Sequence, residues 1–403
     1  FPGLSAGWVI SEENFFEPLK DVFSFFKLKG SWGMMGNDNI TAYQYLSMYS
    51  FNTDSYYAFG KTPVSVQSIY ETVTANPLVT WETAKTWNIG FSSQFLNGKL
   101  GLDLDYFQSN RNDILITRNA SIPTYSGLSL PAENLGKVKN HGFEAIATYR
   151  DSKGDFEWGV TGNVTYAKNE VVYADEAADT PAWQRETGHP IDGGTYYKAL
   201  GIYQTQEQIE STPHLSGTKI GDLIYQDTNK DGNITWDDAV RRDKSATPKW
   251  IFGLTLNGSW KGMDVNAFFQ GQADAEILVQ PTMNMATDFY EGRWSESNTA
   301  EQNAAAKWPR AFMKASSVDN RNSQSSTWWL RDASFVRLKS LEIGYTFPKT
   351  LISPLGVEKL RLYVNGNNLF TIDSVGIFDP EMTNGIRGYS LQRSWTFGLN
   401  VTF

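Results

Sequence analysis

Apolar and polar residues alternate with a period of two along many stretches of this 403-residue chain. The most regular stretch is SWTFGLNVTF at 394–403, in which every second residue is apolar: Trp395, Phe397, Leu399, Val401 and Phe403. Such strict alternation is typical of a β-strand with one apolar face and one polar face. A soluble protein rarely makes its exposed terminus the most regular part of its sequence, so the other strands must indicate what this apolar face contacts.

Pairs of alternating stretches are joined by short turn sequences. The first pair turns at Asn97-Gly98 and the third at Lys261-Gly262. Asn-Gly between alternating segments is a strong signal for a hairpin. The predicted hairpins are 86–108, 141–169, 249–271, and the segment 334–349 with 359–370.

Residues 4–10, residues 28–35 and the terminal stretch add three strands, so the sequence predicts about eleven long strands in all. Outer-membrane barrels have short periplasmic turns and long extracellular loops, whereas a soluble sandwich has no reason to keep every long loop at one end. An odd number of strands also means that this chain alone cannot close a barrel of even strand number. The predicted connections alternate between short ones at 96–99, 151–155, 261–262 and 348–358 and long ones at 37–83, 109–140, 170–248, 272–333 and 371–392.

One predicted strand can be compared with the thickness of a bilayer. Trp250 and Trp260 lie on the same face, together with Phe252, Leu254 and Leu256. Ten residues at about 3.3 Å each, tilted by about 40°, separate the two indoles by roughly 25 Å along the membrane normal. This distance matches the apolar band between the aromatic girdles of a transmembrane barrel. Two core tryptophans of a soluble sandwich would give the same local pattern.

The opposite faces of these strands are polar. Such a face suits a hydrated lumen, or a lumen packed against a polar plug, although a solvent-facing sheet would look the same locally. The residues on it are Asn88, Ser92, Gln94, Asp103, Asp105, Thr161, Asn163, Thr165, Asp264, Asn266, Gln270, Arg361, Tyr363, Asn365 and Asn367.

Composition is compatible with a barrel and argues against other classes. Mean hydropathy is −0.40 and no apolar run is long enough for a membrane helix, yet 14% of the residues are aromatic. Because a transmembrane strand needs only half of its residues apolar, low mean hydropathy does not exclude a membrane. A net charge of −9 with scattered Lys and Arg argues against a nucleic-acid binder. The lack of cysteine excludes disulfides and thiolate metal sites.

Several motifs resemble the C-terminal half of SusC/RagA-type TonB-dependent outer-membrane transporters, and they occur in the family's order. The resemblance implies an all-β fold, a 22-stranded antiparallel transmembrane barrel of which residues 1–403 form the C-terminal part, about eleven strands with long extracellular loops. The motifs are NPLVTWETAKTWNIGF at 76–91, ENLGKVKNHGFEA at 133–145, GIYQTQEQI at 201–209, GDLIYQDTNKDGNIT at 221–235, SFVRLKSLEIGYTFPK at 334–349, RLYVNGNNLF at 361–370 and WTFGLNVTF at 395–403.

The family's signal peptide, TonB box, plug domain and first barrel half have no counterpart in this sequence. We therefore expect the chain to be part of a longer protein whose missing segments lie upstream. Within the family, the terminal aromatic strand resembles the signal that the outer-membrane assembly machinery recognises. On this view the chain stops on a strand because that strand closes the barrel.

The resemblance also implies a function. Members of this family import oligosaccharides or oligopeptides across the outer membrane, with a SusD-like surface lipoprotein capping the barrel and the TonB complex acting through the plug. The expected contacts are therefore that lipoprotein, the TonB complex, membrane lipids and the substrate, but no nucleic acid. From the residues alone a second class stays open, a soluble all-β glycan-binding module. Neither class identifies the substrate or the residues that would contact it.

The sharpest local motif is DTNKDGNITWDD at 227–238. Asp227, Asn229, Asp231, Asn233 and Asp238 fall at positions 1, 3, 5, 7 and 12, which is the spacing of an EF-hand or dockerin-like calcium loop. The motif departs from EF-hands in having Asp rather than Glu at position 12, and no flanking helices are evident. The alternative is a turn rich in Asp, Asn and Gly that binds no ion, because these residues favour turns in any case.

Catalysis has little support in the sequence. His141, His189 and His214 are far apart and have neither metal-ligand spacing nor a triad context. We therefore expect no enzyme activity and no cofactor other than the possible calcium ion.

Residues 299–308 have the composition of a short helix. The long loops carry aromatic residues that could stack on sugars, pack against a partner or pin the loops together: Trp183, Trp294, Trp308, Trp328 and Trp329.

Overall fold

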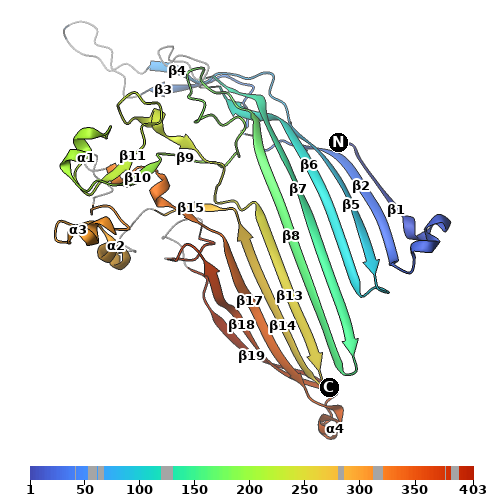
Figure 1. Cartoon of the computed structure of the whole chain (residues 1–403). Helices are drawn as coiled ribbons and strands as arrows, with labels where there is room; N and C mark the ends of the chain where they lie inside the picture. Colours follow the sequence, from blue (N-terminus) through green and yellow to red (C-terminus); the bar gives the residue numbers. More distant parts are fainter. Residues whose placement is uncertain are drawn as a thin grey trace.

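One antiparallel sheet dominates the computed structural model, which describes residues 1–40, 42–52, 61, 68–118, 130–279, 286–311, 321–376, 378–382 and 390–403. Within these ranges the sheet has eleven strands that follow one another up and down in chain order (Figure 1). The predicted all-β fold class and strand number are thus confirmed. The strands are β1 (Gly3–Val9), β2 (Phe23–Asn37), β5 (Glu82–Phe95), β6 (Leu100–Thr117), β7 (Ala132–Lys153), β8 (Phe156–Tyr173), β13 (Trp250–Trp260), β14 (Met263–Ala273), β17 (Phe335–Thr346), β18 (Lys359–Asp373) and β19 (Ser394–Thr402).

Short connections lie at one end of the sheet and long connections at the other, as predicted (Figure 1). Several strands are longer than the alternation of apolar residues indicated. β6 and β7 remain paired well into polar sequence, so the connection expected at 109–140 shortens to 118–131. The reason is that backbone hydrogen bonds pair strands whatever their side chains are, and therefore continue beyond the apolar band.

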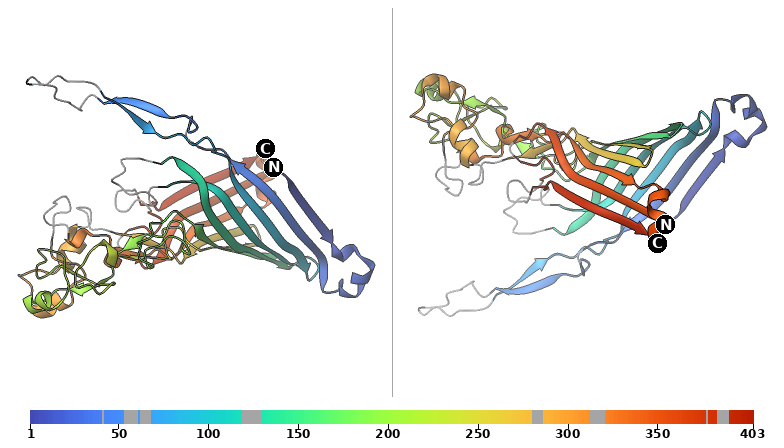
Figure 2. Two further views of the ribbon diagram at one scale, coloured as in Figure 1. Left: turned by 90° about the horizontal axis from the view of Figure 1, so that it is seen from above. Right: turned by 90° about the horizontal axis from the view of Figure 1, so that it is seen from below.

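The register places one continuous apolar face across all eleven strands of the described sheet. Leu254 on β13 is paired with Phe269 on β14 and with Gly162 on β8, and Trp250 and Trp260 share its face as predicted. Leu254 is 38% exposed and Trp260 52% exposed. So large an exposed apolar surface is typical of contact with lipid. Figure 2 shows the sheet curved into an open trough with β1 and β19 as its two edges.

The long connections hold the small elements. Their strands are β3 (Met48–Asn52), β4 (Ser68–Val73), β9 (Thr195–Tyr196), β10 (Ala199–Ile202), β11 (Leu223–Tyr225), β12 (Val240–Arg241), β15 (Glu276–Leu278) and β16 (Leu330–Asp332), which pair as β3-β4, β9-β12, β10-β11 and β15-β16. Their α-helices are α1 (Gln206–Ser211), α2 (Ala286–Gly292) and α3 (Ala300–Ala304), while α4 (Lys349–Ile352) lies in the short connection between β17 and β18. Among the described residues, no helix has the length and apolar character needed to span a membrane.

Short 3₁₀ helices complete the described connections. The first short connection, between β1 and β2, contains η1 (Ile10–Glu12) and η2 (Asn14–Leu19), whose buried Phe16 packs against Phe23 and Phe26 of β2. The others are η4 (Trp236–Asp238), η6 (Arg321–Ser323), η7 (Thr327–Trp329) and η8 (Ser353–Leu355).

A compact apolar core lies among the long connections, outside the sheet. Three connections, 174–249, 274–334 and 374–393, contribute to it, and we call the described part of these three segments the loop cluster. Its buried core residues are Tyr197, Ile202, Leu223, Tyr225, Ile234, Ala239, Ala275, Ile277, Val279, Trp294, Trp308, Trp329, Ala333 and Val375. The sheet itself needs no such core because each of its faces contacts a medium rather than a second layer.

Candidate functional site: the polar face and the loop cluster

The polar face of the sheet gathers the residues that alternation placed opposite the apolar face. Asn266 on β14 is paired with Glu342 on β17, and Glu342 is paired with Asn365 on β18. Ser92 on β5 is likewise opposite Asp103 on β6. The register therefore brings the predicted polar residues onto one continuous surface, which is the chemistry of a hydrated lumen.

Ion pairs tie neighbouring strands of the polar face together. The Arg361 guanidinium donates to Asp264 Oδ1 at 3.0 Å and to Glu342 Oε1 at 2.7 Å, which links β18 to β14 and β17. Lys29 Nζ on β2 lies 2.6 Å from Asp105 Oδ2 on β6. Alternation predicted the positions of Arg361, Asp264 and Asp105 on this face, but it did not predict their partners.

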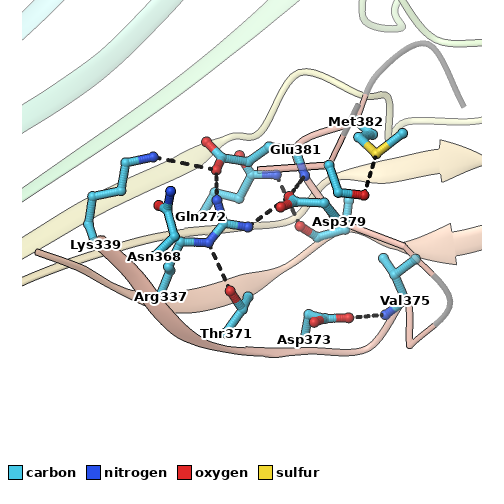
Figure 3. A network of polar contacts seen from close by, with 12 residues as sticks. Gln272, Arg337, Lys339, Asn368, Thr371, Asp373, Val375, Asp379, Glu381 and Met382 are labelled. Carbon is cyan, nitrogen blue, oxygen red and sulfur yellow. Dashed lines mark hydrogen bonds and ion pairs between the residues drawn. The ribbon is translucent and has the colours of Figure 1, made fainter. Parts of the chain in front are cut away.

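A buried arginine anchors the last long connection to the polar face (Figure 3). Arg337 on β17 is only 1% exposed. Its Nη2 donates to Asp379 Oδ1 at 2.7 Å, its Nε donates to Thr371 Oγ1 at 2.8 Å, and its Nη1 donates to Glu381 Oε2. Lys339 Nζ lies at 4.0 Å from the same Glu381 carboxylate. Two carboxylates and a hydroxyl thus satisfy the buried guanidinium, and they hold residues 378–382 against the sheet.

The predicted aromatic residues of the loops mostly pin the loops to each other. Trp294, Trp308 and Trp329 are buried in the loop cluster, and the rings of Trp308 and Trp329 stack at a centroid distance of 5.7 Å. Trp183 Nε1 donates to the backbone oxygen of Asp237 at 2.8 Å. Close by, the short helix expected within 299–308 forms as α3, with Thr299 as its N-cap.

A cavity of about 1030 Å³ opens at the surface of the loop cluster. The Arg331 guanidinium lies there 5.2 Å from the centroid of the Trp308 ring, and its Nη1 donates to the backbone oxygens of Trp328 and Leu330. Burial lowers the pKa of Arg331 below its usual value. Within the described residues Trp328 Nε1 has no hydrogen-bond partner. Because Asp288 and Glu291 line the cavity together with Arg331, it offers charged groups of both signs to a polar ligand.

The 227–238 loop folds as a closely hydrogen-bonded turn. Asp227 accepts bonds from the backbone N–H groups of Lys230 and Gly232 at 2.7 and 2.9 Å. Gly232 has φ +84°, a conformation that glycine adopts without strain. Within the loop, Asp231 Oδ1 accepts a bond from the backbone N–H of Asn233 at 2.8 Å.

The last predicted calcium ligand, Asp238, is fully buried at the end of this loop. Its carboxylate accepts backbone bonds from Thr228 at 2.7 Å and Thr235 at 2.8 Å, and it completes a capping box with Thr235. These bonds are what the turn alternative predicts, but carboxylate oxygens retain lone pairs that could bind an ion. Calcium binding by Asp227, Asn229, Asp231, Asn233 and Asp238 stays a prediction.

The three histidines occupy separate settings. His141 lies on the apolar face of β7, while His189 Nδ1 is 2.6 Å from Asp243 Oδ1 and His214 Nδ1 is 2.9 Å from the Thr212 backbone oxygen. In the described part of the chain, no group of three or more His, Asp or Glu side chains is arranged to hold a metal ion. The histidines therefore do not form a common site.

Comparison with known proteins gives consistent results. The family described as TonB dependent receptor-like, beta-barrel matches residues 2–369. The whole chain aligns at 28% identity with 42% of TonB-dependent receptor P3 of Formosa agariphila, and at 27% identity with 40% of TonB-dependent receptor SusC of Bacteroides thetaiotaomicron. The chain thus spans about two fifths of the length of these relatives.

The fold is also found among solved structures. The structure of the RagAB peptide transporter superposes with a TM-score of 0.74 at 21% identity, over 100% of this chain and 43% of the transporter chain. The RagAB peptide importer in its open-open state gives a TM-score of 0.72, also at 21% identity, over 100% of this chain and 42% of that chain. Identity at this level shows a shared fold.

Proposed function

Because the chain belongs to the TonB-dependent receptor-like β-barrel family, we propose that it forms part of the barrel wall of a transporter that imports oligosaccharides or oligopeptides across the outer membrane. Membership confirms the resemblance found in the sequence, the outer-membrane location and the expectation that the chain is not an enzyme. A soluble glycan-binding module would not be an integral outer-membrane protein, so this location excludes the alternative function class.

The two contrasting faces of the sheet carry this proposal. An apolar face for lipid and a polar face for a water-filled lumen, with long connections at one end only, are the features that a barrel needs to pass a polar solute. The cavity beside Arg331 and Trp328 lies among those long connections and supplies polar contacts for a solute. The similar RagAB proteins are described as a peptide transporter, which supports oligopeptides as one substrate class.

We extend the proposal to the partners. The energy would come from the TonB complex, acting through a plug domain upstream of residues 1–403 in the whole protein. A SusD-like surface lipoprotein would cap the mouth, where it would meet the loop cluster. The position of the loop cluster at the end with the long connections supports this contact (Figure 1).

Native purification tests the proposal. The whole protein that contains this chain is extracted from outer membranes in mild detergent, and mass spectrometry identifies every co-purifying chain and bound small molecule. We expect the remaining barrel and plug segments, a surface lipoprotein and a trapped oligosaccharide or oligopeptide. Recovery of the protein as a soluble species without detergent would contradict the barrel. Recovery of the barrel without a lipoprotein would contradict the proposal that a SusD-like lipoprotein caps it.

A further inference from the structure

On three of the four neighbouring strands β5 to β8, namely β5, β7 and β8, the apolar face ends in basic residues on the side of the long connections. On β5 the residues of this face run from Ile89 and Trp87 to Lys85, and on β8 they run from Tyr166 to Lys168. On β7 the same face runs from Phe143 through His141 to Lys139 and Lys137. We call Lys85, Lys137, Lys139 and Lys168 the basic rim.

Strand register brings the basic rim into one patch. Lys139 is paired with Asn110 on β6, and Asn110 is paired with Lys85 on β5. Lys85 and Lys139 are therefore two strand spacings apart, about 10 Å between their backbones. His141 is paired with Lys168, one step toward the apolar band. Lys137 lies two residues beyond Lys139 on the same face, so a single headgroup can reach several of these side chains.

On the strands that form the patch, lysines outnumber carboxylates. Lys139 Nζ is 3.0 Å from Glu170 Oε1, and Asp113 accepts a hydrogen bond from Thr83 at 3.1 Å near Lys85. Within the described residues, Lys85, Lys137 and Lys168 have no ion pair. Strands β5 to β8 contribute four lysines and two carboxylates, Glu170 and Asp113, to this rim; outside the strands, Lys168 also lines a pocket with Asp192 and Asp243.

The opposite rim of the same strands is different. Lys99 Nζ lies 2.7 Å from Asp151, and Lys261 Nζ lies 3.9 Å from Asp155. At the end with the short connections, Lys99 and Lys261 thus have carboxylate partners, whereas Lys153 has no ion pair within the described residues. Three of the four lysines in the basic rim therefore lack an ion pair within the described residues, against one of these three lysines at the opposite rim.

Aromatic residues fix the depth of the basic rim in the membrane. Trp87, Tyr106, Phe143, Tyr166 and Trp250 share the apolar face directly below it, and the rings of Tyr166 and Trp250 are 4.7 Å apart. Such aromatic belts lie at the boundary between hydrocarbon and headgroups. Lysine side chains one or two positions beyond the belt extend into the headgroup layer, where they attract anionic lipids.

We propose that the basic rim binds the phosphate groups of a phosphorylated lipid in the outer leaflet, whose acyl chains lie along the apolar face of β5 to β8. The site would be occupied from outside the barrel and is separate from the lumen and from the cavity of the loop cluster. The lipid would hold this section of the wall at a fixed depth.

Lipid binding to the whole protein tests the proposal. The protein is placed in phosphatidylcholine nanodiscs, and its binding of bisphosphorylated lipid A is compared with its binding of dephosphorylated lipid A by native mass spectrometry. The test variant combines Lys85→Gln, Lys137→Gln and Lys168→Gln. Because each lysine near a membrane surface contributes about fivefold to binding of anionic lipid, we expect roughly 100-fold weaker binding of the phosphorylated form. Replacement of the same lysines by Arg should retain binding.

A matched variant removes three lysines from the opposite rim: Lys99→Gln, Lys153→Gln and Lys261→Gln. It should bind phosphorylated lipid A as the unmodified protein does. Resistance of all variants to unfolding in SDS without heating shows that the barrel is assembled. Equal binding by the basic-rim variant, equal loss in the opposite-rim variant, or equal binding of dephosphorylated lipid A would each overturn the proposal.

Discussion

Leu254 occupies the middle of the apolar face, and its neighbour Thr255 lies on the polar face of the same strand. Replacement of Leu254 by Arg would place a cation in the hydrocarbon of the bilayer. We expect a loss of about 2 to 4 kcal/mol in the free energy of folding into lipid vesicles, or failure to insert. The fraction of folded protein over a urea titration in vesicles measures the effect.

Thr255→Arg is the matched control, since it adds the same side chain one residue away on the lumen side. We expect it to cost much less, because a lumen-facing cation keeps its water. Equal losses for the two variants would mean that the two faces do not differ in environment, which would contradict the assignment of the apolar face to lipid.

Arg337 is a second single residue with a predictable effect. Replacement of Arg337 by Ala leaves Asp379 without its close partner in a buried setting, and we expect a loss of about 3 kcal/mol. Detachment of the last long connection should appear as faster proteolytic cleavage within residues 374–393. Lys339→Ala removes only the longer, partly exposed contact with Glu381 and should cost less than about 1 kcal/mol. If cleavage speeds up equally in both variants, Arg337 is not the anchor.

Among the elements, the 227–238 loop offers a test of metal binding. If the loop binds calcium, an ion concentration about 100 times its Kd should stabilise the folded protein by about 2.7 kcal/mol, seen as a higher Tm. Asp231→Ala removes a predicted ligand and should abolish this response. Asp237→Ala removes an exposed carboxylate of the same loop that is not at a ligand position and should preserve it. If calcium does not change the Tm of the unmodified protein or of either variant, the loop is a turn that binds no calcium.

The elements also show what the sequence can and cannot predict. The strands were predictable because each side chain contacts a uniform medium, lipid or water, so alternation alone encodes the face. The ends of β6 and β7 were not predictable, since paired strands made of polar residues show no alternation of apolar and polar positions. Nor was the packing of the loop cluster, in which Trp329 stacks on Trp308 of the same connection while residues from the other two connections complete the core. The partners of Arg337 were missed for the same reason, because Asp379 and Glu381 follow no local spacing that identifies them.

At the scale of the whole molecule, the sheet formed by the described residues has two edges without a pairing strand, β1 and β19. An open edge exposes backbone donors and acceptors that are costly to leave unpaired in lipid. We therefore expect residues 1–403 produced alone in detergent to associate through these edges rather than to remain monomeric. Light scattering coupled to size-exclusion chromatography measures the mass. A stable monomer would show that the edges are satisfied without further strands.

The core shared by three connections has a consequence for the order of assembly. Its residues come from connections that follow β8, β14 and β18, so we expect them to meet only when the strands from β8 to β18 share one register. A slip of a single residue in any of those strands would exchange the two faces of that strand and shift the connection that follows it. The loop cluster would then fail to close, leaving Trp308 and Trp329 exposed. We therefore infer that closure of the cluster reports correct strand register, because a wall built in the wrong register would leave these indoles open to the proteases and chaperones of the cell envelope.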